Sequence, residues 1–181
     1  EERIAALEGG VAALGLASGQ AASAYAIQNL CSNGDNFVAS SHLYGGTYNQ
    51  FKNPFSDMGI EVRFVDPSDP QNFADATDDK TRAYYGEVLP NPSFQVFPLQ
   101  EVADLGRPLG IPLIVDNTAA PLICRPFDHG AAIIIHSATK YIGGHGTSIG
   151  GVIVDGGDFD WEANPERQPK LNNPDPNYNG V

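Results

Sequence analysis

The chain has 181 residues, the size of one ordinary domain, and its 41% apolar content excludes a wholly disordered polypeptide. Ten basic against 22 acidic side chains give a formal charge of −12, which argues against nucleic acid and anionic membrane surfaces as partners. No apolar run approaches the roughly 20 residues that a membrane-spanning helix needs, so we expect a soluble protein.

Helical patterns open the chain. Apolar residues at positions 4, 7, 11 and 14 recur at spacings of three and four, which predicts an amphipathic helix over residues 1–15. Ser18 is a favourable N-cap for a second helix over residues 20–30. The sequence Asn33-Gly34-Asp35 then predicts a turn.

Short apolar runs rich in Ile and Val follow this turn. They predict strands at residues 37–39, 60–65, 83–88, 113–115, 131–135 and 149–154, with a short helix between Pro98 and Gly110. Continuous apolar strands separated by helical segments are typical of a sheet that is buried on both faces. The sequence therefore predicts a three-layer α/β/α fold with a mostly parallel sheet.

The character of the chain changes after Asp155. Residues 156–181 carry four prolines and few core-forming side chains. A free-standing domain seldom ends in so long an irregular segment, so we expect the natural chain to continue beyond Val181. Residues 1–155 are predicted to form the core of the domain. The two cysteines, Cys31 and Cys124, are far apart in sequence and are interpreted as free thiols in a reducing cytoplasm.

Ligands of open α/β sheets bind beyond the carboxyl ends of the strands, and Lys140 follows one such strand. We expect this amine to be crowded by the backbone of Gly143, Gly144 and Gly146. Desolvation would then lower its pKa, as Schiff-base chemistry requires. An ordinary surface lysine at a strand end is the alternative.

Phosphate-binding groups are predicted close to this lysine. Ser137 and Thr139 supply two hydroxyls, while Gly19 and Gln20 supply backbone N–H groups at a helix N-terminus, where an anion is stabilised. Asp116 ends another strand and can pair with a protonated ring nitrogen, or alternatively cap the turn that follows it. A lysine, an acid and a phosphate cup together fit pyridoxal 5′-phosphate (PLP).

Five motifs occur in the order of a known family. They are LASGQAA at 16–22, LYGGTY at 43–48, Asn91-Pro92, VDNT at 115–118 and SATKYIGGHG at 137–146. The chain resembles the Cys/Met-metabolism family of PLP-dependent enzymes, which have an aminotransferase-like large domain of fold type I. The segments at 44–51, 59–66 and 146–151 most resemble O-acetylhomoserine sulfhydrylases.

The resemblance implies a role for each site residue. Lys140 would carry PLP as a Schiff base and act as acid and base, and Asp116 would hold the pyridinium nitrogen. The phosphate would be bound by Gly19, Gln20, Ser137 and Thr139. Tyr44 would stack on the ring and assist proton transfer, and Asn91 would bond the ring hydroxyl or the substrate. No metal is expected.

The resemblance also implies an activity. It is a γ-replacement that transfers sulfide, or another thiol, onto O-acetyl-L-homoserine to give homocysteine and acetate, in methionine and cysteine biosynthesis. A cytoplasmic homo-oligomer, a dimer of dimers, is expected. The alternatives are a cystathionine γ-synthase, a cystathionine or methionine γ-lyase, or an inactive fragment of such an enzyme.

Three unrelated functions receive weak support. Residues 146–150 match the G-x-S-x-G motif of hydrolases, but a strand follows Ser148 and every histidine precedes it. His129, His136 and His145 lack the spacing of metal ligands. Dinucleotide binding would need a G-x-G-x-x-G motif after an early strand, and none is present.

Overall fold

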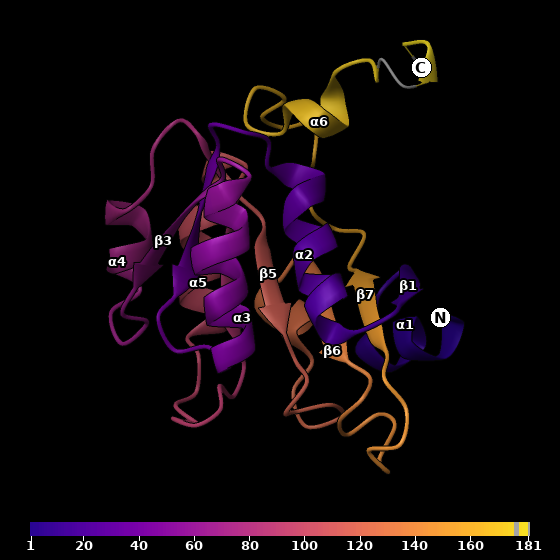
Figure 1. Ribbon diagram of the computed structural model, residues 1–181. Helices are drawn as coiled ribbons and strands as arrows, with labels where there is room; N and C mark the ends of the chain where they lie inside the picture. The colour runs from indigo at the N-terminus through magenta and orange to yellow at the C-terminus, as the bar shows by residue number, and fades with distance from the viewer. Residues whose placement is uncertain (176–177, 181) are drawn as a thin grey trace.

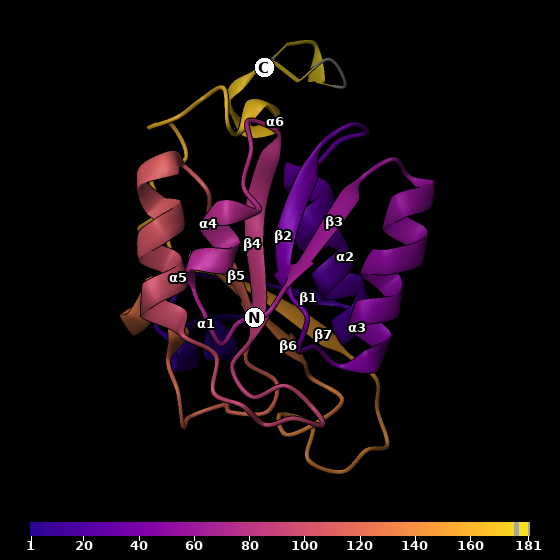
Figure 2. The same ribbon diagram turned by 90° about the vertical axis from the view of Figure 1, so that its left-hand side faces the viewer.

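The computed structural model describes residues 1–175 and 178–180. Within this part of the chain, seven strands form one sheet that lies between two layers of helices (Figures 1 and 2). The predicted three-layer α/β/α class with a mostly parallel sheet is confirmed. No helix among the described residues combines the length and apolar character needed to cross a membrane.

The sheet has the order β1-β7-β6-β5-β4-β2-β3. The strands are β1 (Ala12–Leu16), β2 (Asn36–Ser40), β3 (Glu61–Val65), β4 (Thr81–Glu87), β5 (Leu113–Asp116), β6 (Ile133–Ser137) and β7 (Gly151–Asp155). Strands β3, β2, β4, β5 and β6 pair in parallel, whereas β7 is antiparallel to both β6 and β1. The carboxyl ends of β4, β5 and β6 therefore meet at one edge of the sheet.

Each face of the sheet has its own helices (Figure 2). One face is covered by α2 (Gly19–Leu30), α3 (Gly45–Gln50) and the π-helical turn η1 (Phe51–Phe55). The other is covered by α1 (Glu2–Glu8), α4 (Gln71–Asp75) and α5 (Leu99–Gly106), with the 3₁₀ turns η2 (Arg107–Leu109) and η3 (Pro126–His129). This double cover explains why the strands read as continuous apolar runs.

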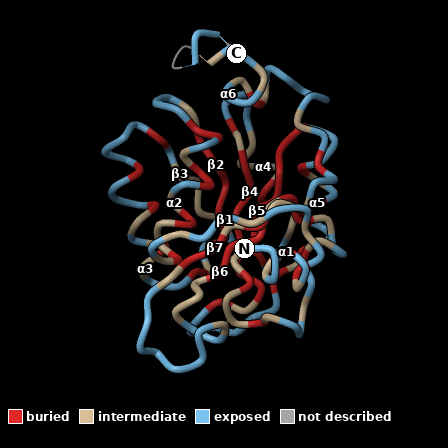
Figure 3. Tube along the Cα trace, turned by 90° about the vertical axis from the view of Figure 1, so that its right-hand side faces the viewer, coloured by how far each residue is buried: buried red, intermediate tan, exposed pale blue. Residues whose placement is uncertain are grey.

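Burial follows the strands through the middle of the molecule (Figure 3). On the α2 face, Phe51 makes edge-to-face contacts with Phe37 at 4.9 Å and with Tyr85 at 4.8 Å between ring centroids. All three rings are fully buried. Such aromatic pairs add about 0.5–1.5 kcal/mol each beyond the burial of their area, so this cluster fixes α3 and η1 against the sheet.

The predicted helix over residues 1–15 is wrong after Glu8. Gly9 adopts a left-handed conformation with φ of 81°, and its N–H closes the helix on the carbonyl of Ala5. Residues Ala12–Leu16 then pair with β7 as an edge strand. The apolar spacing at positions 11 and 14 was compatible with a helix, but the Gly9-Gly10 pair ends it.

The prediction for the second helix is confirmed. Ser18 has an extended backbone, and its Oγ accepts a hydrogen bond from the Ala21 N–H at 3.0 Å. The helix begins at Gly19, one residue before the predicted start. It places its N-terminus at the same edge of the sheet as the ends of β5 and β6 (Figure 1).

The segment after β7 packs on the opposite, amino edge of the sheet (Figure 1). It contains a short helix, α6 (Pro169–Asn172), preceded by turns. Gln168 is buried, and its side-chain amide donates to the carbonyl oxygens of Arg82 at 2.9 Å and Gly110 at 3.0 Å. These bonds hold the segment against the start of β4, at the edge opposite the candidate site.

Candidate active site

Two chain segments approach each other closely at the carboxyl edge of the sheet. A Cβ atom added to Gly19 would lie 2.6 Å from the Cβ of Ser137, and one added to Gly151 would lie 2.0 Å from the carbonyl oxygen of Ser18. Both distances are shorter than the non-bonded contacts that Cβ atoms make in proteins, so glycine is required at both positions. The start of α2 therefore lies directly against the end of β6 and the start of β7.

This contact creates an anion-binding corner. The N–H groups of Gly19 and Gln20 are the first two of α2, where no carbonyl of the preceding turn is available, and neither has a partner among the described residues. The Ser137 hydroxyl lies beside them, since its Oγ is 3.1 Å from the Cβ position of Gly19. Free N–H groups, a hydroxyl and the positive end of a 12-residue helix suit a phosphate.

Asp116 ends the neighbouring strand β5. Its Oδ1 accepts a hydrogen bond from the Thr118 N–H at 2.8 Å, and the Thr118 hydroxyl in turn accepts one from the Ser137 N–H at 2.7 Å. One short network thus joins the predicted ring-binding carboxylate to the predicted phosphate-binding serine.

Burial raises the pKa of Asp116 above its ordinary value, although the hydrogen bonds of Thr118 and the nearby His136 act in the opposite direction. The carboxylate is therefore incompletely compensated by the described residues. A cationic partner placed beside the carboxylate would stabilise the ionised form. A protonated ring nitrogen has the required charge and shape.

Lys140 lies in the turn that follows β6, with its N–H bonded to the Ser137 carbonyl at 3.1 Å. The expectation that its side chain is crowded by backbone is wrong for this chain, because Lys140 is exposed. The glycine-rich loop after it leads into β7. There, the Gly150 N–H donates to the Thr139 hydroxyl at 3.1 Å, and that hydroxyl lies 3.3 Å from the Gly150 carbonyl oxygen.

The three remaining predicted site residues lie in different parts of the site or outside it. Tyr44 immediately precedes α3, and its backbone N–H reaches β4. The Gln20 side chain donates to the Thr47 hydroxyl of α3 at 3.1 Å, so it braces the two helices. Asn91 is exposed in the loop after β4, and no hydrogen bond among the described residues joins it to the other predicted site residues.

Glu87 is a further acidic residue of the site that the sequence did not single out. This residue ends β4 and pairs in register with Asp116, and its Oε1 accepts the Tyr44 N–H at 2.8 Å. It is 6% exposed. An acidic residue at the end of a predicted strand singled out Asp116, whereas the strand predicted over residues 83–88 ran one residue past Glu87.

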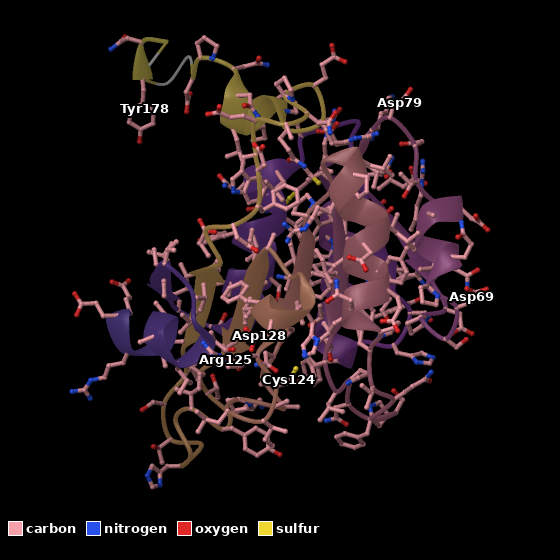
Figure 4. The ribbon with its side chains drawn as sticks, turned by 180° about the vertical axis from the view of Figure 1, so that it is seen from behind. Asp69, Asp79, Cys124, Arg125, Asp128 and Tyr178 are labelled. Carbon is pink, nitrogen blue, oxygen red and sulfur yellow. The ribbon has the colours of Figure 1, made fainter. Side chains whose placement is uncertain are left out.

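A buried polar cluster under the site was also overlooked. His136 and Glu8 are hydrogen-bonded between Nε2 and Oε1 at 2.5 Å, and Asn117 donates to the same Glu8 oxygen at 3.0 Å. Arg125, labelled beside α1 in Figure 4, donates its Nε to the Glu8 carbonyl at 3.4 Å. These residues come from distant parts of the chain, and no local pattern joins them.

The chain has close relatives among characterised proteins. It is 51% identical over 183 aligned residues to a homocysteine/cysteine synthase of Saccharomyces cerevisiae, and 50% identical over 182 to an O-acetyl-L-homoserine sulfhydrylase of Leptospira meyeri. Each alignment covers 100% of this chain and 41% of the relative. The chain thus spans less than half the length of the relatives it matches.

Solved structures agree with this likeness. A Campylobacter jejuni structure containing N′-pyridoxyl-lysine-5′-monophosphate matches 99% of this chain and 45% of its own, with a TM-score of 0.96 and 36% identity. The O-acetylhomoserine sulfhydrylase of Wolinella succinogenes matches 91% of this chain and 48% of its own, with a TM-score of 0.83 and 38% identity.

The fold and the site together define a class, the PLP-dependent proteins of fold type I. The model of the Cys/Met metabolism PLP-dependent enzyme family matches residues 1–173. The chain belongs to this family, so the predicted family and its cofactor are confirmed.

Proposed function

We propose that this chain forms the cofactor-binding part of an O-acetylhomoserine sulfhydrylase, which transfers sulfide onto O-acetyl-L-homoserine and releases acetate. The observation that carries the proposal is the identity of 50–51% with relatives named homocysteine/cysteine synthase and O-acetyl-L-homoserine sulfhydrylase. Because the chain spans 41% of those relatives, the activity is assigned to the whole protein.

The residues present fit PLP. The N–H groups of Gly19 and Gln20, which have no partner among the described residues, meet the Ser137 hydroxyl where the cofactor phosphate would lie. Asp116 offers a carboxylate to the ring nitrogen from the adjacent strand. Lys140 is exposed, and its amine would form the covalent bond to the cofactor aldehyde. Thr139 is proposed to complete the phosphate site from the same loop.

When bound, PLP supplies an electron sink for a carbanion at the substrate Cα. Asp116 would keep the ring nitrogen charged by holding its proton through an ion pair. The Lys140 Nζ would accept the Cα proton as a general base, and Tyr44 would cover the ring and assist proton transfer. At the substrate Cγ, the C–O bond to acetate breaks and a C–S bond to sulfide forms, so the products are homocysteine and acetate.

The proposal extends to the domain bounds, the role of Asn91, the oligomeric state and the location of the protein. We infer that residues 1–155 form the core of the large domain, and that 156–181 lead into further chain. Asn91 is proposed to contact the ring hydroxyl or the substrate. We further propose a homo-oligomer, arranged as a dimer of dimers, that acts in the cytoplasm on an amino acid and on sulfide or a thiol.

The test uses the intact protein saturated with PLP. Homocysteine formation from O-acetyl-L-homoserine and sulfide is compared with turnover of cystathionine. Borohydride reduction followed by peptide mass spectrometry then locates the cofactor. We expect sulfide-dependent homocysteine and a pyridoxyl mass on the Lys140 peptide.

Lys140→Ala should lose both the adduct and the turnover, whereas Lys80→Ala, which changes an exposed lysine at the opposite edge, should keep both. Faster turnover of cystathionine would replace the proposed substrate. An adduct on another lysine would overturn the assignment of Lys140.

A further inference from the structure

Glu87 and Asp116 form a pair of adjacent carboxyl groups. They are the last residues of β4 and β5 and lie opposite each other in the parallel register. Opposite residues on neighbouring strands point to the same face of a sheet. Tyr85 and Ile114, two positions earlier on the same strands, belong to the core between the sheet and α2 and α3, so Glu87 and Asp116 lie on that face too. Figure 2 shows that α2 and α3 cover this face of the sheet.

Glu87 also fastens the segment that carries Tyr44. The Tyr44 N–H donates to Glu87 Oε1 at 2.8 Å across 43 positions of sequence. The Tyr44 side chain is 47% exposed, so burial contributes little to its position. Among the described residues, the backbone bond to Glu87 ties the start of α3 to the carboxyl edge of the sheet.

The charge of the pair is decided by its surroundings. Burial and the neighbouring Asp116 raise the pKa of Glu87 to about 8, and the Tyr44 N–H lowers it only in part. Burial raises the pKa of Asp116 as well, but two hydrogen-bond interactions with Thr118 and the charge of the nearby His136 lower it. Two close carboxyl groups do not both ionise readily, so the group with more compensating partners, Asp116, would carry the negative charge near neutral pH.

Other titratable groups do not change this assignment. On the same strand, burial and both carboxyl groups raise the pKa of the Tyr85 phenol, which stays neutral and hydrogen-bonded to Ser23 at 3.0 Å. The phenol of Tyr44 is exposed. His42, on the loop before Tyr44, interacts electrostatically with Asp66, the residue that follows β3.

We propose that Glu87 is a positioning residue of the site, an uncharged acid that holds Tyr44 through its carbonyl oxygen and leaves the single negative charge on Asp116. This inference rests on the proposed PLP site. It assigns the pair two separate tasks: Asp116 holds the ring nitrogen, and Glu87 sets the position of the residue that covers the ring. Glutamine is the neutral isostere that can perform the second task.

The experiment compares the intact proteins carrying Glu87→Gln, Glu87→Ala and, as a matched control, Glu101→Gln on an exposed position of α5. The dissociation constant for pyridoxal 5′-phosphate is measured at pH 7 on cofactor-free protein. We expect Glu87→Ala to weaken binding at least tenfold, and Glu87→Gln and the control to stay within threefold of the wild type. If Glu87→Ala fails to fold, the Gln variant and the titration below decide.

A second readout does not involve the cofactor. With ¹³C-labelled glutamate, cofactor-free wild-type protein should show one carboxyl signal that titrates near pH 8 and is absent from Glu87→Gln. A Gln variant that binds as weakly as the Ala variant would mean that Glu87 acts as an anion, and would overturn the proposal.

The proposal would also be overturned if the Glu87 carboxyl titrated in the ordinary acidic range, or if Glu87→Ala bound PLP as tightly as the wild type. Failure of sulfhydrylase activity alone, with these results intact, would refute only the proposed substrate.

Discussion

The Glu8 carboxylate and the His136 imidazole meet at 2.5 Å between Oε1 and Nε2, although 128 positions separate them. Both side chains are essentially inaccessible to solvent. Asn117 joins them by donating to the same oxygen. His136 precedes Ser137 in the chain, and Asn117 follows Asp116. This contact therefore ties α1 to the backbone next to both of these site residues.

Removal of Glu8 should be costly. Glu8→Ala leaves His136 and the Asn117 amide without their shared acceptor in a dry interior, and we expect a loss of about 3 kcal/mol in the free energy of unfolding. Urea unfolding of the intact protein, followed by circular dichroism, measures it. Glu2→Ala, an exposed change on the same helix, should stay within about 0.5 kcal/mol of the wild type. Equal losses in both variants would contradict a special role for the buried pair.

A methyl group at Gly19 should disturb the anion-binding corner. In Gly19→Ala the new Cβ would meet the Ser137 Cβ at 2.6 Å and its Cα at 2.8 Å, so α2 must move away from β6. We expect a loss of about 1–3 kcal/mol in stability, the usual range for overpacking, together with weaker binding of PLP. Gly45→Ala is the matched control, because a Cβ there meets nothing within 4 Å. Unaltered binding in Gly19→Ala would remove this helix terminus from the proposed site.

Neutralising Asp116 should weaken the binding of the cofactor. Asp116→Asn keeps the side chain's shape but removes the charge that would face the ring nitrogen. A hydrogen bond to a charged group is worth about 1.5–3 kcal/mol, so we expect about 10- to 100-fold weaker PLP binding. Equilibrium dialysis of the cofactor-free protein measures it. Asp79→Asn, an exposed change labelled in Figure 4, should bind as the wild type does. Equal affinities of Asp116→Asn and wild type would place the ring nitrogen elsewhere.

Local sequence signals predicted the elements that depend on local chemistry. Ser18 marked the start of α2, and the Ile and Val runs marked β5 and β6, because capping and two-sided burial leave a pattern within a few residues. Asp116 and Ser137 were found by the same route. Each lies at the end of such a run.

Features that depend on distant partners escaped prediction. The strand β1 exists because Ala12–Leu16 pairs with β7, about 140 positions away, and five small or aliphatic residues give no strand pattern of their own. The helix α3 begins with Gly45-Gly46, a poor helical start, and is held by the Tyr44 bond to Glu87 and by aromatic packing. The exposure of Lys140 depends on the path of the loop after it, which the glycine-rich sequence leaves open.

The acid sensitivity of the fold should depend on Asp78, at the amino edge of the sheet. Burial raises its pKa, but this effect is outweighed by hydrogen bonds from Asn36 at 2.8 Å and Arg63 at 2.7 Å and from the Lys80 N–H at 2.8 Å. The net pKa lies well below the ordinary 3.8. A depressed pKa in the folded state contributes stability above pH 3.8, and this contribution is lost as the pH falls below that value.

Asp78→Asn should therefore be less stable than the wild type at pH 7, and the difference should shrink as the pH is lowered toward 2. The urea midpoint of the intact protein, measured at pH 7, 4 and 2.5, tests this. Asp79→Asn changes the next residue, which is exposed, and should follow the wild-type curve throughout. If the difference between Asp78→Asn and wild type is constant over this range, the carboxylate does not titrate with folding, and its hydrogen bonds stabilise the amino edge without regard to charge.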